Sequence, residues 1–402
     1  MGEWMKLRLG LVGCGGMGCR HIRGLERLRE IGQPTWELVG VCDLFPASAM
    51  RAADLAQELL DTRPAEFGTL AEMQAACDLD AIIVTTSPDL HAPVGLEAFA
   101  LGLHVMVEKP IALTVEQGAS LVDAADRTGR KLAVAENYRR DPTNRLAKAL
   151  LDAGVIGPLH LFIQSSSGSG ERVIITPWRH RKQSGGIVVD MGIHYADLLE
   201  YLVGPIADVF GMNGIVDQER IDTEGTTHEV DAEDLSVGVA RFANGAIGNW
   251  VIDLAGRGQG HFSRVAYGRG GTLSIPPDRS GRPLDLTVRR AGADVAIGTD
   301  EQLALVPDFR LDPVTTALFG GERLASYNLP FETIDANLLA IEQADFAAAI
   351  RDDRSPEVDG AFGLRSLAIS YGFLEAELLG RALRVDDLLT TFDTPYQAGL
   401  TV

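Results

Sequence analysis

A glycine-rich segment near the start of the chain is the feature that most constrains its fold. Residues 13–18 read Gly-Cys-Gly-Gly-Met-Gly; they follow an apolar run, residues 7–12, and precede a helix-like stretch over residues 17–30. A second apolar run, residues 38–42, ends in Asp43. A G-x-G-x-x-G loop between a strand and a helix, with an acidic residue after the next strand, is typical of a dinucleotide-binding βαβ unit.

Each part of this pattern has a physical role in binding a dinucleotide. Gly13 and Gly15 allow a tight turn and a close approach of the backbone to a pyrophosphate. The helix N-terminus offers unpaired N–H groups and the positive end of the helix dipole to the phosphates. Asp43 can accept hydrogen bonds from ribose hydroxyls and would repel a 2′-phosphate, and Leu44 supplies no cation. The pattern therefore predicts NAD as the cofactor, in preference to NADP.

Length and charge narrow the class of protein. The chain has 402 residues, enough for two domains, and no apolar run approaches the roughly 18 residues of a membrane span. Its formal net charge of −20 argues against a nucleic-acid or anionic-membrane partner. Residues 1–6 lead directly into the first strand, so we expect no signal peptide.

The cysteines favour a reducing compartment. The chain has Cys14, Cys19, Cys42 and Cys77, none of them in a C-x-x-C pair. This spacing favours neither a structural zinc site nor a disulfide framework, and we expect no metal. The sequence therefore predicts a cytoplasmic protein.

The first 137 residues alternate strand and helix patterns. Continuous apolar runs predict buried parallel strands at residues 7–12, 37–42, 81–85, 104–108 and 132–136. The intervening segments predict helices at residues 17–30, 47–60, 93–101 and 115–128. The alternation predicts an α/β domain over residues 1–137, a Rossmann-type doubly wound parallel sheet that binds NAD at the carboxyl ends of its strands.

The pattern changes over residues 138–402. Alternating runs without intervening helices predict strands at residues 158–167, 206–216, 235–242, 246–254, 264–267 and 272–275. Helices are predicted at residues 144–153, 188–203, 333–351 and 361–379, whereas residues 277–332 give no readable pattern. We predict an α+β domain with a large, mostly antiparallel open sheet.

Lysine is scarce in this chain, and one lysine stands where chemistry is expected. Glu108, Lys109 and Pro110 end the fourth predicted strand. Strand ends of this kind face the ligand in a doubly wound sheet, which places Lys109 beside the nicotinamide half of the cofactor. The alternative is an ordinary surface ion pair before a proline.

A second group of polar side chains recurs at helical spacing. Asp190 and His194 are i and i+4, and Asp197 follows His194 by three, so all three share one helix face. A carboxylate beside an imidazole fixes its tautomer and raises its basicity, as a general base requires. The alternatives are a buried histidine satisfied by its neighbour, or a pair of metal ligands.

Other polar residues are weaker candidates. His91 lies after the third predicted strand and is expected near the cofactor, although Ser87 or Asp89 in the same segment can instead cap a helix. Trp178 and Arg179 precede the glycine pair before the second-domain helix and can contact a sugar face or a substrate oxygen. Simple packing is the alternative for both.

The combination of these motifs resembles one known family. The glycine loop, Glu108-Lys109-Pro110, Asn137-Tyr138-Arg139, Trp178-Arg179 and Gly185-Gly186-x-x-x-Asp190-x-Gly192-x-His194-x-x-Asp197 are similar to motifs of the glucose-fructose oxidoreductase/inositol dehydrogenase/rhizopine-catabolism (Gfo/Idh/MocA) family. The resemblance covers roughly residues 5–385. It implies NAD(P)-dependent oxidation of CH–OH groups in sugars, inositols or related polyols, and a homodimer or homotetramer formed through the C-terminal sheet.

The resemblance also implies roles for individual residues. Lys109, Asp190 and His194 match the family's catalytic trio. The cofactor is expected to contact Gly13, Gly15, Gly16, Met17, Gly18, Asp43, Leu44, Thr85, Ser87, His91, Glu108, Lys109 and Asn137. The substrate is expected to contact Lys109, Tyr138, Trp178, Arg179, Asp190 and His194. The chain departs from the family's motifs at two positions: Ile187 stands where a third glycine is often found, and Tyr138 stands where arginine is more usual. Because of these differences, the resemblance does not identify the substrate.

The expected reaction is a hydride transfer to NAD. His194, oriented by Asp190, removes the hydroxyl proton, and Lys109 hydrogen-bonds to the developing alkoxide. Some relatives instead oxidise a glycoside transiently, eliminate the aglycone and reduce the product, which makes them net hydrolases. Elimination needs a second base, for which the chain offers Tyr138, Tyr195 or His261. Other relatives are non-catalytic dinucleotide sensors, which the intact trio argues against.

Overall fold

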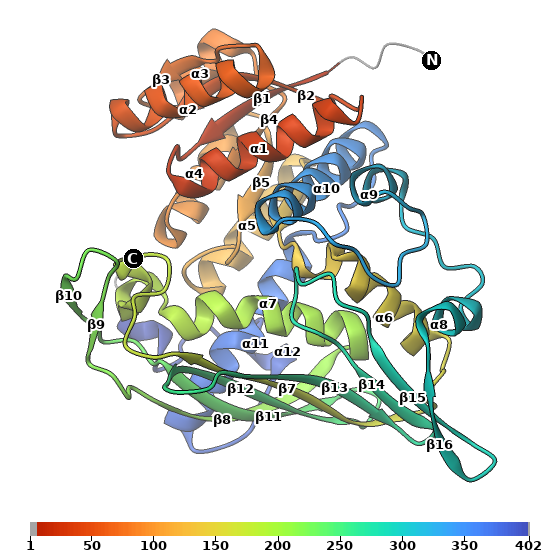
Figure 1. The fold of residues 1–402 in the computed structure, drawn as a ribbon. Coiled ribbons are helices and arrows are strands. Elements are labelled where there is room, and N and C mark those ends of the chain that lie inside the picture. The colour runs from red at the N-terminus through yellow and green to blue at the C-terminus, as the bar shows by residue number, and fades with distance from the viewer. Residues whose placement is uncertain (1–5, 401–402) are drawn as a thin grey trace. The chain divides into compact units, whose positions relative to one another are not determined.

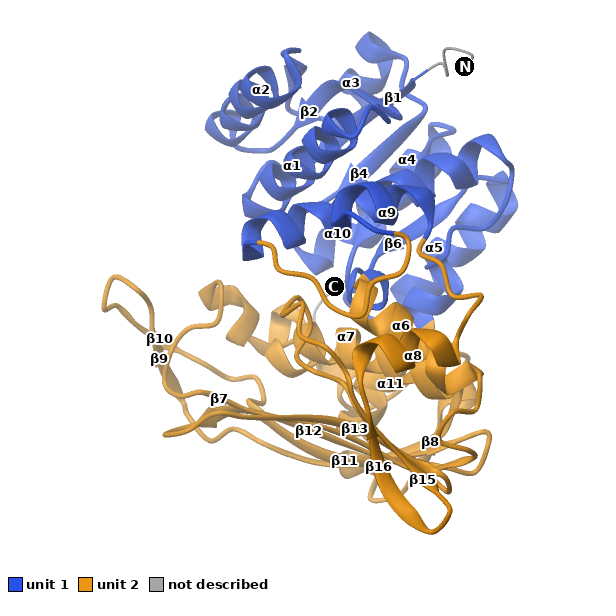
Figure 2. Ribbon diagram, turned by 45° about the vertical axis from the view of Figure 1, so that its right-hand side comes forward, with its two compact units in different colours: residues 1–140, 312–321, 330–364 blue, residues 141–311, 322–329, 365–402 orange. Residues whose placement is uncertain are grey.

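The computed structural model describes residues 6–400 and divides into two compact units. Unit 1 comprises residues 1–140, 312–321 and 330–364, and unit 2 comprises residues 141–311, 322–329 and 365–402 (Figure 2). Residues 1–5 and 401–402 lie outside the described part, so the expectation of no signal peptide falls on residues that the structure does not describe.

Unit 1 is built on a parallel sheet of six strands. Its order is β3-β2-β1-β4-β5-β6, and all neighbouring strands run parallel. The bounds are β1 Leu7–Val12, β2 Trp36–Cys42, β3 Ala65–Phe67, β4 Ala81–Val84, β5 His104–Glu108 and β6 Leu132–Ala135. The strand order reverses between β1 and β4, because the chain returns from β3 at one edge to β4, which pairs with β1. The predicted doubly wound Rossmann sheet is therefore confirmed, and its ligand-binding edge lies beside β1.

Helices connect these strands (Figure 1). They are α1 Gly16–Glu30, α2 Pro46–Leu60, α3 Leu70–Cys77, α4 Pro88–Ala100 and α5 Val115–Thr128, followed by the 3₁₀ turn η1 Tyr138–Arg140. Helix α4 begins five residues before the predicted start, because Pro88 occupies its first turn, where a missing N–H costs nothing. Strand β3 and helix α3 are short and were not predicted.

The division into compact units differs from the predicted boundary between residues 137 and 138. Helices α9 (Pro313–Phe319) and α10 (Phe331–Arg351), which lie in the predicted second domain, belong to unit 1. Helix α10 packs on α1 and β2: the Trp36 indole N–H donates to the Gln343 carbonyl (2.9 Å), and the Trp36 and Phe346 rings lie 5.5 Å apart. Contacts between residues more than 300 positions apart leave no local pattern in the sequence.

Unit 2 is built on a nine-stranded sheet of order β16-β15-β14-β13-β7-β12-β11-β8-β17. The β7–β12 pair is parallel and the remaining pairs are antiparallel, which confirms the mostly antiparallel open sheet. Its strands are β7 Leu159–Ser169, β8 Ile206–Gly214, β11 Leu235–Phe242, β12 Ile247–Gly256, β13 His261–Gly268, β14 Gly271–Ser274, β15 Asp285–Arg290, β16 Ala293–Ile297 and β17 Leu383–Arg384.

Other elements of unit 2 surround this sheet. The hairpin pairs β9 Glu219–Ile221 with β10 Thr227–Glu229. The helices are α6 Pro142–Asp152, α7 Ile187–Val203, α8 Thr299–Leu305 and α12 Val385–Leu388, with 3₁₀ turns η2 Pro177–His180, η3 Lys182–Ser184 and η4 Gln397–Gly399. Helix α11, Gly360–Leu379, crosses the boundary between the units. The unreadable residues 277–332 contain β15, β16, α8 and α9.

The two faces of the nine-stranded sheet differ. Helices α6 and α7 lie over one face (Figure 1), where α7 packs against the fully buried Trp250 of β12. On the other face Met212, Val237, Val239 and Ile247 are between 43% and 65% exposed. Among the described residues, no helix has the length and apolar character needed to cross a membrane.

Candidate functional site

The glycine loop is shaped by its own packing at two positions. Gly13 has φ +93°, and a Cβ there would stand 2.8 Å from the Thr85 backbone. A Cβ on Gly18 would stand 2.3 Å from the Gly13 carbonyl oxygen, which also accepts a hydrogen bond from the Thr85 hydroxyl. The first and last glycines of the motif are therefore required for the loop to lie against β4.

The middle glycines are different, because the fold itself does not require them. Where a Cβ would stand on Gly15 or Gly16, no atom of the described chain beyond the local backbone lies within 4 Å. Gly15 is the N-cap of α1, and no side chain makes a capping hydrogen bond to the first N–H groups of the helix. Bare backbone and a helix N-terminus together fit a pyrophosphate.

Asp43 is held beside this loop by two backbone groups. Its Oδ2 accepts the Cys14 N–H at 2.7 Å, and its Oδ1 accepts the Phe45 N–H at 2.8 Å. These bonds fix the carboxylate at the end of β2 and leave each oxygen a further lone pair. Leu44 is 77% exposed and brings no positive charge to the carboxylate.

The predicted residues after β4 have mixed roles. Ser87 stands at the N-cap of α4, but its side chain makes no capping bond. The His91 ring is buried: Nδ1 lies 2.7 Å from the Pro110 carbonyl oxygen and Nε2 lies 3.1 Å from that of Thr86. Burial lowers the pKa of His91, against the opposing effect of these carbonyls, so the ring is neutral. The His91 ring thus lies between two ligand-side loops, and as a neutral imidazole with a single N–H it can donate to only one of the two carbonyl oxygens.

Three predicted residues lie at the carboxyl ends of β5 and β6. Glu108 is buried, and its Oε2 accepts the Lys109 backbone N–H at 3.1 Å. Asn137 is also buried, and its Oδ1 has no hydrogen-bond partner among residues 6–400. An unpartnered buried acceptor is costly, so a water or a ligand at the end of β6 can supply the missing donor.

In unit 2, glycines set the position of helix α7. Gly185 (φ +93°) and Gly186 (φ +79°) make the turn that starts the helix. A Cβ on Gly192 would stand 2.4 Å from the Trp250 ring, so only glycine lets α7 approach β12 this closely. The Trp250 indole N–H donates to Ser236 at 3.1 Å, which fixes the ring.

The predicted acid and base lie on α7. Asp190 and His194 are each 7% exposed, and Asp197 is 1% exposed. The Arg179 Nε lies 3.3 Å from Asp190 Oδ2, and the Arg179 guanidinium stacks 4.4 Å from the centre of the Trp178 ring. An arginine paired with this carboxylate favours its charged form.

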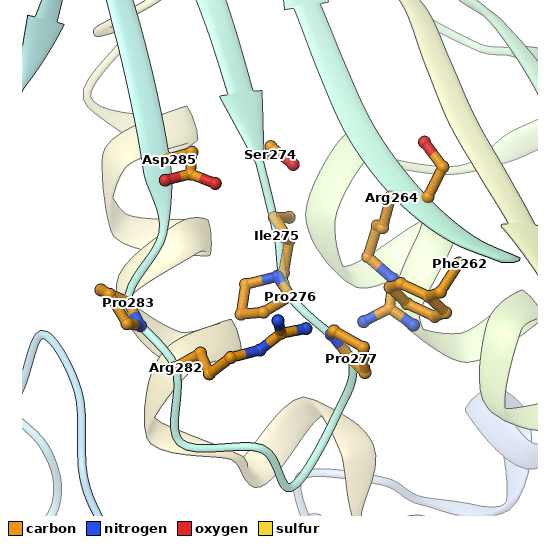
Figure 3. A pocket seen from close by; sticks show the side chains of 10 residues that line it. Phe262, Arg264, Ser274, Ile275, Pro276, Pro277, Arg282, Pro283 and Asp285 are labelled. Carbon is orange, nitrogen blue, oxygen red and sulfur yellow. The ribbon is translucent and has the colours of Figure 1, made fainter. Parts of the chain in front are cut away.

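Unit 2 also contains a pocket of about 310 Å³ at the end of β13 and β14 (Figure 3). Its lining includes Phe262, Arg264 and Arg282. It includes none of the residues predicted to bind the cofactor or substrate or to act in catalysis. Arg264 makes two bonds to Asp278, at 2.7 and 2.9 Å, and its guanidinium lies 5.9 Å from the ring of Tyr195, the neighbour of His194. No local pattern signalled this pocket.

The cysteines near the glycine loop are poorly suited to nucleophilic chemistry. Burial, reinforced by Asp43, raises the pKa of Cys14 to about 12 and that of Cys42 to about 11. All four thiols are free. Among the described residues, no group of three or more His, Cys, Asp or Glu side chains is arranged to hold a metal ion.

The predicted catalytic residues belong to different units. Lys109 and all the predicted cofactor residues lie in unit 1, whereas Trp178, Arg179, Asp190 and His194 lie in unit 2. Within unit 1 the structure brings the predicted cofactor residues to the ends of β1, β2, β4, β5 and β6. Sequence reasoning missed the buried partners of Glu108, which are His21 and, through it, Gln343.

Two models of one family match the chain. The oxidoreductase family with an NAD-binding Rossmann fold (GFO_IDH_MocA) matches residues 7–136, and the GFO/IDH/MocA C-terminal domain matches residues 144–274. Inositol 2-dehydrogenase of Rhizobium meliloti is 32% identical over 201 residues, which is 50% of this chain and 56% of that protein. Levoglucosan dehydrogenase of Pseudarthrobacter phenanthrenivorans is 28% identical over 263 residues, which is 60% of this chain and 66% of that protein.

A shorter match is to a protein named as a glycosyl hydrolase. A glycosyl hydrolase family 109 protein of Shewanella baltica is 29% identical over 157 residues, 38% of this chain and 33% of that one. Each of these alignments thus spans less than two thirds of the curated relative.

A solved structure extends the likeness to the whole fold. The structure of levoglucosan dehydrogenase with NADH and L-sorbose superposes with a TM-score of 0.75 at 22% identity, covering 95% of this chain and 100% of that one. The two family models and this shared fold agree with the glycine loop and the motif on α7. The chain belongs to the Gfo/Idh/MocA family of NAD-binding oxidoreductases.

Proposed function

We propose that this protein is an NAD-dependent dehydrogenase that oxidises a CH–OH group of a sugar, an inositol or a related polyol or glycoside. The observation that carries the proposal is a glycine loop with open space above Gly15 and Gly16, in a family that includes inositol and levoglucosan dehydrogenases. The acid–base pair Asp190 and His194 on α7 supplies the matching chemistry.

The residues of unit 1 fit a dinucleotide. Gly13, Gly15, Gly16, Met17 and Gly18 would hold the pyrophosphate through their backbones. Asp43 and Leu44 would face the adenosine ribose, where the fixed carboxylate favours NAD over NADP. Thr85, Ser87, His91, Glu108, Lys109 and Asn137 would line the nicotinamide half, with the unpartnered Asn137 Oδ1 as an acceptor.

The protein's part in the reaction is proton transfer and charge stabilisation. NAD, when bound, supplies the hydride acceptor. His194 removes the proton of the substrate hydroxyl, and Asp190 stabilises the resulting imidazolium. Lys109 donates a hydrogen bond to the oxygen on which negative charge develops. Because Asp190 is itself paired with Arg179, it stays a carboxylate while the histidine gains its proton.

Substrate recognition is proposed to involve Tyr138, Trp178 and Arg179 in addition to the catalytic groups. Arg179 is held in one place by Thr176 (Nη1 to Oγ1, 2.6 Å) as well as by Asp190. A guanidinium fixed in this way can bind a hydroxyl without a large loss of side-chain entropy.

A redox glycoside hydrolase is the second candidate, and the glycosyl hydrolase family 109 relative supports it. Such an enzyme regenerates NAD in each cycle and needs a base for elimination. Tyr195 is a weak choice, because burial raises its phenol pKa and its hydroxyl donates to Ser166 at 3.2 Å. We favour the dehydrogenase because the two relatives that align over more residues, 201 and 263 against 157, are both named as dehydrogenases.

We also propose a cytoplasmic homodimer or homotetramer that assembles through the open face of the nine-stranded sheet. An exposed apolar patch on neighbouring strands of that face consists of Met212, Val237, Val239 and Ile247. Apolar residues clustered in this way are more typical of an interface than apolar residues scattered singly over a surface. Sedimentation of the wild type and of Val239→Lys tests this: the variant should dissociate, and an unchanged mass would contradict the proposed interface.

One assay tests the proposed function. The protein is incubated with NAD and a panel of inositols, free sugars, anhydrosugars and aryl glycosides, while NADH absorbance and aglycone release are followed together. Formation of NADH that scales with substrate supports the dehydrogenase. Sustained aglycone release without NADH would favour the hydrolase, and neither signal on the whole panel would refute both.

A further inference from the structure

The residue before Lys109 is held by a buried chain of hydrogen bonds within unit 1. Glu108 Oε1 lies 2.9 Å from His21 Nε2 on α1, and Glu108 Oε2 accepts the Lys109 backbone N–H at 3.1 Å. Burial raises the pKa of Glu108, but the bond from His21 and the charge of Lys109 outweigh burial and leave the pKa below its usual value. Glu108 is therefore an anion that connects α1 to the backbone of Lys109.

Gln343 of α10 determines which nitrogen of His21 carries the proton. The Gln343 Nε2 lies 2.9 Å from the His21 carbonyl oxygen and 3.1 Å from His21 Nδ1. Because a carbonyl oxygen can only accept, the amide must present its NH₂ to it. The same NH₂ then donates to Nδ1, which must be unprotonated. The proton therefore sits on Nε2 and is donated to Glu108.

The adjacent carboxyl does not compete with Glu108 for His21. Glu342 is fully buried, and neither of its oxygens has a hydrogen-bond partner among residues 6–400. Burial, together with the nearby charge of Glu108, raises its pKa well above the ordinary value, so Glu342 is neutral. Glu108 is left as the charged partner of the imidazole.

We propose that Gln343 and His21 are positioning residues that hold Glu108, and through it Lys109, in the arrangement needed for catalysis. The inference rests on the proposed function of Lys109. It adds two residues of unit 1 to the site, and one of them, Gln343, lies more than 200 positions away from Lys109 in the chain. A displacement of about 1 Å at a reacting group can cost on the order of 10²-fold in rate.

The experiment compares four variants by kcat, KM, NAD affinity and melting temperature. His21→Leu and Gln343→Leu remove one link each, and His21→Gln restores an N–H donor of similar reach. Asn337→Leu is the matched control, because Asn337 is equally buried on α10 and bonds only Leu318 and Arg27 in the described structure. It should lower the melting temperature and leave kcat unchanged.

The two leucine variants should lower kcat by about 10–100-fold, with NAD affinity and KM within a few-fold of the wild type, and His21→Gln should recover most of the loss. A kcat for His21→Leu equal to that of Asn337→Leu, or no recovery in His21→Gln, would overturn the proposal.

A second measurement does not depend on activity. The ¹⁵N spectrum of the full-length protein, with His21 assigned by comparison with His21→Gln, reports its tautomer. We expect the Nε2–H form. A proton on Nδ1 would overturn the proposal even in an active enzyme, whereas an Nε2–H signal in a protein inactive on every polyol would place the failure in the proposed function instead.

Discussion

Two glycine-rich segments lead into helices in this molecule, and they use glycine for opposite reasons. In unit 1 the middle glycines, Gly15 and Gly16, face open space. In unit 2, Gly192 faces the Trp250 ring, with no room for a Cβ. The first segment therefore offers bare backbone to a ligand, whereas the second brings a helix close to the sheet so that its side chains are held in place. A glycine motif can thus mark either a ligand-facing surface or a packing constraint.

The largest effect is expected where side chains act. If the side chains of α7 take part in catalysis, the His194→Ala variant should fold and bind NAD but lose about 10²–10⁴-fold in turnover. The Lys109→Ala variant in unit 1 should show a loss of the same size. Steady-state kinetics together with NAD titration measures this. The double variant should lose less than the product of the two, because both groups act on one proton transfer. Near-full activity in either single variant would show that the site is misassigned.

The glycine of α7 should affect stability. Gly192→Ala forces a methyl group into the Trp250 ring, and overpacking of this kind costs about 1–3 kcal/mol. Denaturant unfolding of the wild type and the variant measures the difference. A variant as stable as the wild type would mean that α7 can move away from β12 without cost, and the contrast between the two segments would fail.

The glycine of the loop should affect binding instead. Gly15→Ala has no steric clash in the fold and should cost at most about 1 kcal/mol of stability at this N-cap position. It should weaken NAD binding at least tenfold, which is about 1.4 kcal/mol, because the methyl group occupies the space proposed for the pyrophosphate. Calorimetric titration decides the matter, and unchanged affinity would mean that the open space is not the phosphate site.

The choice of cofactor is expected to respond to the acid at the end of β2. Asp43→Ser combined with Leu44→Arg removes a repulsion and adds a partner for the 2′-phosphate, so the preference for NAD over NADP should narrow. Titration of both cofactors against both proteins tests this. Tighter binding of NADP than of NAD by the wild type would contradict the role of Asp43.

The smallest effect is expected at the thiol inside the loop. Cys14 contributes its backbone N–H to Asp43, and its thiol is protonated at neutral pH because burial raises its pKa to about 12. Cys14→Ala should therefore keep most of the turnover, and the wild-type thiol should react slowly with iodoacetamide near pH 7. Complete loss of turnover with intact NAD binding would show that the sulfur has a role.

The sequence predicted what is encoded locally. The strand–loop–helix pattern and the i, i+4 spacing of Asp190 and His194 depend on neighbours in the chain, so the parallel sheet and α7 were predictable. The inclusion of α10 in unit 1 was not, because its contacts with α1 join residues more than 300 positions apart. Arg179 and Asp190, which form an ion pair, are only 11 positions apart. The sequence around Arg179 nevertheless does not distinguish an arginine in an ion pair from a solvent-exposed one.

The most direct test of the account is the fate of the substrate hydrogen. A polyol found active in the panel is deuterated at the carbon that is oxidised, and NADH and product are analysed after many turnovers. The account predicts one NADH for each substrate consumed, with the deuterium on that NADH. Consumption of substrate without accumulation of NADH, with the deuterium retained in the product, would contradict it.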